Sequence, residues 1–183
     1  MIGDEFPETL SAARAGSDNA WTEIYRDLAP SVLGYLRGRG ESDAEDLTGE
    51  VFLQVVRDLS AFEGGERDFR AWVFVIAHHR LLDVRRRRIR RPVELMPDPP
   101  ADVAGAADAQ EEAFQRIASA QVRGVLMRLP AEQAAVLLLR VLGQFTVDEV
   151  AGIVGKSPGA VKALQRRGLE SVRRIIAKEG VPL

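Results

Sequence analysis

Residues 146–167 read "TVDEVAGIVGKSPGAVKALQRR" and predict two short helices joined by a tight turn. Thr146 and Glu149 have the spacing of a capping box, in which two side chains satisfy backbone N–H groups at a helix start. Ser157 followed by Pro158 is a strong start for the second helix, and a Gly-Lys pair supplies the turn. The pattern is typical of a helix-turn-helix, whose second helix enters the DNA major groove by its N-terminal half.

The same stretch separates apolar from basic positions. The inward-facing residues are expected to be Val147, Val150, Ala151, Val154, Val161 and Leu164. Basic residues dominate positions 156 to 178, at Lys156, Lys162, Arg166, Arg167, Arg173, Arg174 and Lys178, against the single acid Glu170. Such residues can neutralise phosphates, and those at the start of the helix can reach base edges. The alternative is a basic, solvated helix on a generic bundle.

Upstream of this motif, apolar spacing predicts helices over residues 114–129 and 130–142. Residues 92–112 differ, with four prolines, six acidic residues and neither lysine nor arginine. This composition predicts an extended linker. Its carboxylates could occupy a cationic channel of a partner, or the segment could be a solubilising spacer. We therefore expect an all-α protein of two small helical domains, residues 1–91 and 113–183, joined by an acidic linker rich in proline and alanine.

Helical spacing continues through the first 91 residues. A stripe of apolar residues from Trp21 to Leu36 predicts a helix capped by Asp18 or Asn19 and ended by Gly38 or Gly40. A second helix follows over 42–62, with Ser42 and Glu45 in capping-box spacing. After the polar break "FEGGERDF", a third long helix runs from about Asp68 into a group of arginines.

Composition limits the classes of function. The chain has 183 residues, a formal net charge of -2 and no cysteine, so disulfides and thiolate metal sites are excluded. Neither a signal peptide nor an apolar run of about 20 residues is found, so we expect a soluble cytoplasmic protein with no membrane insertion. No cofactor or metal site is expected, because His78 and His79 are adjacent on a helix and point about 100 degrees apart.

Residues 77–91, "AHHRLLDVRRRRIRR", hold seven arginines within a mildly acidic protein. They could bind nucleic acid, contact a membrane surface or form a solvated helix end. Asp83 is expected to hold a nearby arginine in place. An enzyme using the histidines and Asp83 lacks a nucleophile, a metal cluster and a phosphate loop. Trp72 shares a helical face with Phe69 and Ile76, which favours core packing over direct DNA contact.

Four segments carry a resemblance to a known family: "WTEIYRDLAPSVLGYLR" (21–37), "DAEDLTGEVFLQVVRDLSAF" (43–62), "FRAWVFVIAHHRLLDVRRR" (69–87) and "LPAEQAAVLLLRVLGQFTVDEVAGIVGKSPGAVKALQRR" (129–167). In this order they resemble the sigma-70 family of RNA polymerase sigma factors, specifically its extracytoplasmic-function (ECF, group IV) branch. The resemblance implies an initiation factor with no catalytic site of its own. Its implied partners are core RNA polymerase, double- and single-stranded promoter DNA and an anti-sigma factor.

The resemblance also implies roles for particular residues. The first domain would bind the polymerase clamp through Asp46, Leu47, Glu50, Val51, Phe52 and Gln54, although Leu47 and Val51 could equally be core residues. It would recognise and open the minus-10 element through Phe62, His79, Arg80, Arg85, Arg86, Arg87 and Arg88. The second domain would bind the polymerase flap and read the minus-35 element through Ser157, Gly159, Lys162, Arg166 and Arg167.

Two departures from the family pattern concern base preference. His79 stands where relatives usually carry asparagine, and Ala163-Leu164 where many carry serine-arginine. An aromatic such as Phe62 can stack on an unpaired base, and a histidine can hydrogen-bond a base edge. The competing interpretation of the whole chain is a stand-alone helix-turn-helix regulator that binds duplex operators, and it predicts tight specific binding without polymerase.

Overall fold

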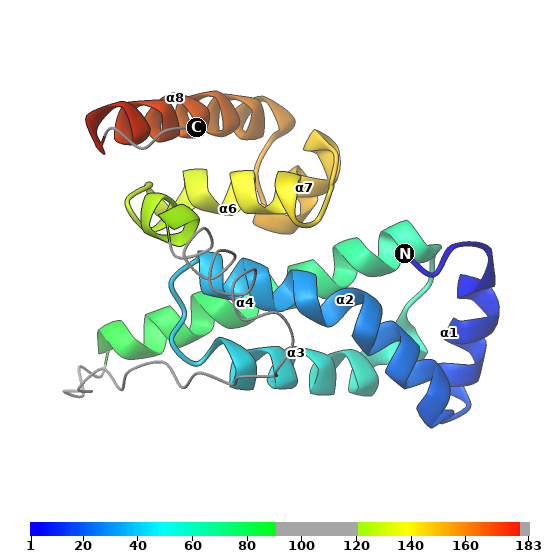
Figure 1. Cartoon of the computed structure of the whole chain (residues 1–183). Coiled ribbons are helices and arrows are strands. Elements are labelled where there is room, and N and C mark those ends of the chain that lie inside the picture. Colours follow the sequence, from blue (N-terminus) through cyan, green and yellow to red (C-terminus); the bar gives the residue numbers. More distant parts are fainter. Residues whose placement is uncertain (91–120, 180–183) are drawn as a thin grey trace, which may run out of the picture.

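The computed structural model describes residues 1–90 and 121–179, and within these ranges the protein is all-α, as predicted (Figure 1). We call residues 1–90 the first half and residues 121–179 the second half. The helices of the first half are η1 (Gly3–Glu5), α1 (Phe6–Arg14), α2 (Asp18–Gly38), α3 (Ala44–Asp58), η2 (Leu59–Ala61) and α4 (Glu66–Arg90). The second half contains a helical turn over 121–127, then α6 (Ala131–Val141), α7 (Val147–Val154) and α8 (Pro158–Glu179).

The first half packs α2, α3 and α4 around one apolar core. The predicted stripe of α2 is buried, with Ile24, Val32 and Tyr35 fully shielded from solvent. Helix α1 was not predicted from the sequence. It buries Phe6 and Leu10 and packs the ring of Phe6 against Phe69 at 5.5 Å between centroids. The N-terminal residues therefore cover the start of α4.

Three predicted helix starts were wrong. Helix α2 is capped by Ser17, whose Oγ accepts from the amide of Ala20 at 3.4 Å, so Asp18 and Asn19 lie inside the helix. Helix α3 begins at Ala44 without a capping box, because Glu45 pairs with Arg37 of α2 instead. Helix α4 begins at Glu66, two residues before the predicted start.

The second half packs α8 and α7 against α6. Residues 134–139 of α6 are all buried, because α8 covers one side of this helix and the first half covers the other. Gly143 allows the turn after α6, since a Cβ there would lie 2.2 Å from the ring of Phe145. Gly168 lets α8 approach α6 closely, with a Cβ position 3.0 Å from Leu137.

The two halves share a continuous core. Helices α6 and α7 lie between α8 and the helices α2 and α4 (Figure 1). The rings of Phe74 and Phe145 meet edge to face at 5.0 Å, and both side chains are almost fully buried. We call this contact the interface between the halves; it is formed by Gly34, Gly38, Phe74, Leu138, Leu142 and Phe145. The predicted linker, residues 92–112, lies outside the described residues, and the domain boundaries stay a prediction.

Candidate nucleic-acid and polymerase interface

The helix-turn-helix forms with the predicted caps. The hydroxyl of Thr146 accepts from the amide of Glu149 at 3.3 Å, and the Glu149 carboxylate accepts from the amide of Thr146 at 2.6 Å. Gly155 ends α7 at φ +64°, in the left-handed region that glycine adopts without strain. Ser157 Oγ then accepts from the amide of Ala160 at 3.2 Å at the start of α8. These local bonds fix where α7 begins and ends and where α8 begins.

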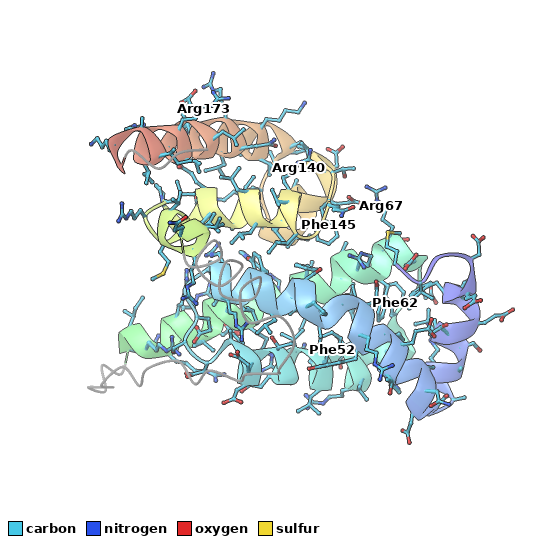
Figure 2. The ribbon with its side chains drawn as sticks, in the orientation of Figure 1. Phe52, Phe62, Arg67, Arg140, Phe145 and Arg173 are labelled. Atoms are coloured by element: carbon cyan, nitrogen blue, oxygen red, sulfur yellow. The ribbon has the colours of Figure 1, made fainter. Side chains whose placement is uncertain are left out.

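Helix α8 separates an inward from an outward face as predicted. Val161 and Leu164 are buried against α6 and α7. The expected minus-35 residues are all exposed, namely Ser157, Gly159, Lys162, Arg166 and Arg167. Arg173, further along α8, points away from the body of the protein (Figure 2). Lys156 differs from these, because its ammonium lies 2.7 Å from Glu132 of α6. The exposed residues thus form a basic surface. Among the side chains that the structure describes, the acid paired with this surface is Glu170, 4.0 Å from Arg166.

Phe62 is only 8% exposed. Its ring packs against Phe69 and Trp72, with centroids 5.2 Å away in each case. Trp72 is therefore part of an aromatic cluster, in agreement with the core-packing interpretation. The carbonyl of Phe62 accepts from the guanidinium of Arg14 in α1. Phe62 lies in the loop between η2 and α4, whereas His79 lies well inside α4, and the described contacts do not join them. The two expected minus-10 residues are therefore at separate places.

A pocket of about 490 Å³ opens beside Phe62. Helix α1 and the start of α2 form one wall of this pocket, and the end of α3, η2 and the loop before α4 form the other. The pocket is lined by Ala13, Arg14, Gly16, Trp21, Val56, Leu59, Ser60, Phe62 and Glu63. The sequence interpretation missed this pocket because it missed α1. The spacing of Phe6, Leu10 and Ala13 is the signal that could have predicted the helix.

His78 and His79 have different surroundings. His78 is buried, with Nδ1 2.7 Å from the hydroxyl of Tyr35. Burial, with a smaller contribution from the nearby Arg39, lowers the pKa of His78 to about 4, and burial raises the pKa of Tyr35 to about 12. Both groups are neutral at pH 7, and only His79 faces solvent. Within residues 1–90 and 121–179, no group of side chains could hold a metal ion.

The arginines of α4 differ in their partners and in their exposure. Arg80 donates to Gln54 at 2.8 Å, so residues expected in two different sites are in contact. Arg85 donates to the carbonyl of Arg39, and Arg88 binds Glu41 at 2.5 Å. The side chains of Arg86 and Arg87 are exposed.

Arg86 lies 3.3 Å from Asp83, which agrees with the expected role of that aspartate. Arg85 and Arg88 bind groups of the turn between α2 and α3. In the part of the chain that the structure describes, Arg86 and Arg87 make no hydrogen bond or ion pair with this turn, so they are more accessible to a phosphate than Arg85 and Arg88.

The expected clamp-binding residues of α3 also divide by burial. Leu47, Val51 and Phe52 belong to the core, and the ring of Phe52 packs against Tyr25 at 4.7 Å between centroids. Asp46 and Glu50 are exposed, and Gln54 is half-buried. Leu53 and Val56, which the sequence interpretation missed, are 67% and 50% exposed. They lie off the apolar stripe of α3, which is the signal that could have identified them as surface residues.

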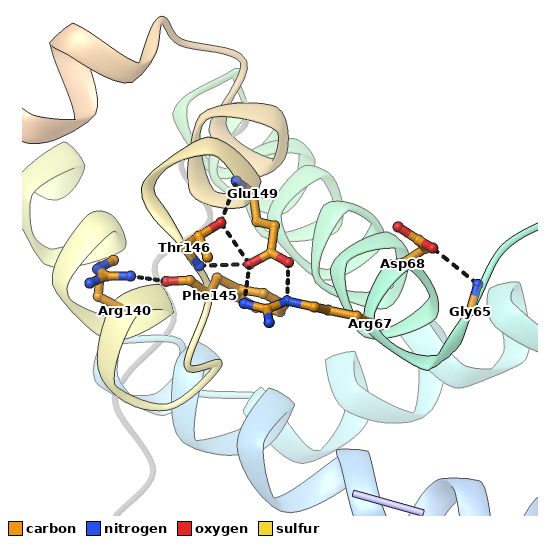
Figure 3. A network of polar contacts seen from close by, with 7 residues as sticks. All are labelled: Gly65, Arg67, Asp68, Arg140, Phe145, Thr146 and Glu149. Carbon is orange, nitrogen blue, oxygen red and sulfur yellow. Dashed lines mark hydrogen bonds and ion pairs between the residues drawn. The ribbon is translucent and has the colours of Figure 1, made fainter. Parts of the chain in front are cut away.

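A polar network crosses between the halves (Figure 3). The guanidinium of Arg67, at the start of α4, binds both carboxylate oxygens of Glu149, with Nη2 3.2 Å from Oε2. The hydrogen bonds from Arg67 and Thr146 lower the pKa of Glu149 to about 2. Arg140 of α6 donates to the carbonyl of Phe145 and so supports the turn before α7. The start of α7 is thus bound to the start of α4.

Comparison with known families agrees with this geometry. The chain matches Sigma-70 region 2 over residues 24–91 and Sigma-70 region 4 over residues 119–172. It is 30% identical over 191 residues to the ECF RNA polymerase sigma factor SigD of Mycobacterium tuberculosis, covering 98% of this chain and 88% of SigD. It is also 30% identical over 173 residues to the ECF RNA polymerase sigma factor BldN of Streptomyces coelicolor, covering 92% of this chain and 65% of BldN.

Solved structures show the same fold. CnrH, in complex with the cytosolic domain of CnrY, superposes with a TM-score of 0.70 at 20% identity, covering 96% of this chain and 99% of CnrH. RpoE of Bartonella quintana, in complex with the anti-sigma factor NepR, superposes with a TM-score of 0.65 at 20% identity, covering 86% of this chain and 96% of RpoE. The two family matches and the ECF relatives define the class of protein as a helical promoter-recognition factor that binds RNA polymerase. The chain belongs to the sigma-70 family, in its ECF branch.

Proposed function

We propose that this ECF sigma factor divides its work between its two halves. The first half binds the clamp of core RNA polymerase and holds the opened minus-10 element, and the second half reads the minus-35 element as duplex. The observation that carries this proposal is the presence, in one chain, of a capped helix-turn-helix with an exposed basic α8 and a region 2 helix bundle. None of the described helices combines the length and apolarity that crossing a bilayer requires.

The exposed members of each predicted set support particular roles. Asp46, Glu50 and Gln54, with Leu53 and Val56, are the candidates for the polymerase contact. His79, Arg86 and Arg87 are the candidates for contact with minus-10 DNA. Arg80, Arg85 and Arg88 support these positions through α3 and its preceding turn. Phe62 would offer a base the edge of its ring beside the pocket, because the face of the ring packs on Trp72.

Other parts of the proposal rest on family membership. Sigma factors initiate transcription and are not enzymes, and we infer that this chain has no catalytic residues. We place it in the cytoplasm, where its polymerase works. CnrH and RpoE were solved with CnrY and with the anti-sigma factor NepR, and we infer that an anti-sigma factor also regulates this chain.

The decisive experiment is an electrophoretic shift with promoter DNA, performed with and without core polymerase. We expect little specific binding by the free chain and specific binding by the holoenzyme. Permanganate should then detect unpaired thymines at the minus-10 element. Tight specific binding by the free chain, without opening, would instead identify a stand-alone helix-turn-helix regulator.

A further inference from the structure

The interface between the halves combines buried apolar contacts with one exposed ion pair. The apolar contacts are close, since a Cβ on Gly38 would lie 2.8 Å from Leu138. The ion pair joins Arg67 and Glu149, 82 positions apart in the chain (Figure 3). Glu149 therefore has two tasks, because the same carboxylate closes the capping box of α7.

Arg67 has a position suited to DNA. It is the second residue of α4 and directly follows the loop that carries Phe62. Its side chain is 60% exposed, and Glu149 is its only partner among the described residues. A guanidinium binds carboxylate and phosphate oxygens with the same paired geometry. Glu149 thus occupies the place that a backbone phosphate of minus-10 DNA could take.

The closed arrangement cannot read both promoter elements. The minus-35 and minus-10 elements are separated by about 25 base pairs, or about 85 Å of B-form DNA. A compact chain of this length has a radius of gyration of about 16 Å. The halves must therefore separate when the two elements are bound, and the pair between Arg67 and Glu149 must break.

We propose that Arg67 and Glu149 form an ionic latch that favours the closed state, and that Arg67 transfers to a DNA phosphate when the halves separate. The second part of this proposal rests on the proposed function, whereas the first part concerns the free protein alone. The apolar contacts hold the halves together, and the latch adjusts the balance between closed and open states. Exposed ion pairs change such a balance by up to about five-fold.

The latch can be tested in the free protein by Förster transfer. The chain contains no cysteine, so Glu8→Cys in α1 and Ala177→Cys in α8 provide unique labelling positions. Arg67→Gln and Glu149→Gln should each lower the closed-to-open ratio about two- to five-fold at low salt. Gln retains the capping box at position 149. Added salt should open the wild type and have less effect on either variant.

The matched control is Arg26→Gln, which removes the same charge from an exposed position of α2. It should leave the ratio unchanged. If Arg67→Gln and Glu149→Gln also leave the closed-to-open ratio unchanged, the proposal of an ionic latch is wrong.

The transfer of Arg67 to DNA is tested with holoenzyme and promoter DNA over a range of salt concentrations. Arg67→Gln should reduce the slope of log K against log salt by about 0.7 if the lost phosphate contact is in the opened strand, or by about 0.9 if it is in duplex DNA. Glu149→Gln should leave the slope unchanged, because Glu149 makes no contact with DNA in this scheme. Equal slopes for wild type and Arg67→Gln would contradict the transfer. If wild-type holoenzyme does not bind the promoter, the proposed function fails while the result for the free protein stands.

Discussion

At the scale of single residues, the adjacent histidines show that a one-residue step along a helix can move a side chain from the core to the surface. His78 lies against Tyr35 in the core, and His79 faces solvent. The sequence could predict that the two point apart, but the apolar stripe of α4 did not decide which one is buried. The same limit applies to Leu47 and Val51, for which the core alternative was correct.

The lowered pKa of His78 predicts a pH-dependent stability. Between pH 6.5 and 4 the unfolded chain binds a proton at His78 that the folded chain does not, so the free energy of unfolding falls as pH falls through this window. Between pH 7 and pH 4.5 the wild type should lose about 2 kcal/mol more than His78→Gln, which cannot titrate. Urea unfolding at both pH values measures this difference.

The control uses the other histidine, since the chain contains only two. His79→Gln should follow the wild-type dependence, because His79 is exposed in the folded protein. If wild type and His78→Gln lose the same free energy of unfolding between pH 7 and pH 4.5, His78 is not held neutral in the folded protein.

At the scale of elements, the sequence predicted α2, α3, α4, α6, α7 and α8. Helix α2 buries one apolar stripe, whereas α6 is buried on more than one side. Helix starts were harder to predict, since several cap residues compete. Ser17 rather than Asp18 caps α2, and Glu45 pairs with Arg37 instead of closing a box. The capping box of Thr146 was predicted correctly, and Glu149 closes it although the same carboxylate also binds Arg67.

The exposed apolar residues of α3 predict a specific loss of polymerase binding. Leu53 is 67% exposed, so Leu53→Asp should change the free energy of unfolding by no more than about 0.5 kcal/mol. It should nevertheless weaken binding to core polymerase, because it places a charge in an apolar contact. Ile89→Asp, at an 81% exposed position near the end of α4, is the control. Fluorescence anisotropy with labelled protein would measure the affinity of both variants for core polymerase. If Leu53→Asp binds with wild-type affinity, this surface of α3 is not the polymerase contact.

At the scale of the whole molecule, the packing of the two halves could not be predicted from the sequence. Each half has its own periodic pattern, but the meeting of Phe74 with Phe145 depends on the shapes of both surfaces. Gly34 and Gly38 are part of this fit, and the sequence offered only a helix end at Gly38. Local patterns predict elements, whereas close approach between distant elements depends on non-local contacts.

The glycines of α2 allow the closed state to be weakened without damaging a helix. In Gly34→Ala/Gly38→Ala the new methyl groups press on Leu142 and Leu138, at starting distances of 3.2 and 2.8 Å. The closed fraction should fall in the Förster experiment, while α2 gains helix propensity. Gly49→Ala in α3 is the matched control, since no atom lies within 4 Å of its Cβ position. It should gain up to about 1 kcal/mol of stability with no change in closure. If Gly34→Ala/Gly38→Ala remains as closed as the wild type in the Förster experiment, the described packing of the two halves is contradicted.

The contact between Phe74 and Phe145 also has a consequence for synthesis on the ribosome. The first half emerges earlier, and the patch around Phe74 has no cover until Phe145 follows, roughly 70 residues later. At 5–20 residues per second, the nascent chain exposes this patch for about 4 to 14 s. The patch is therefore available to chaperones during translation, and a pause within the intervening segment would prolong that exposure.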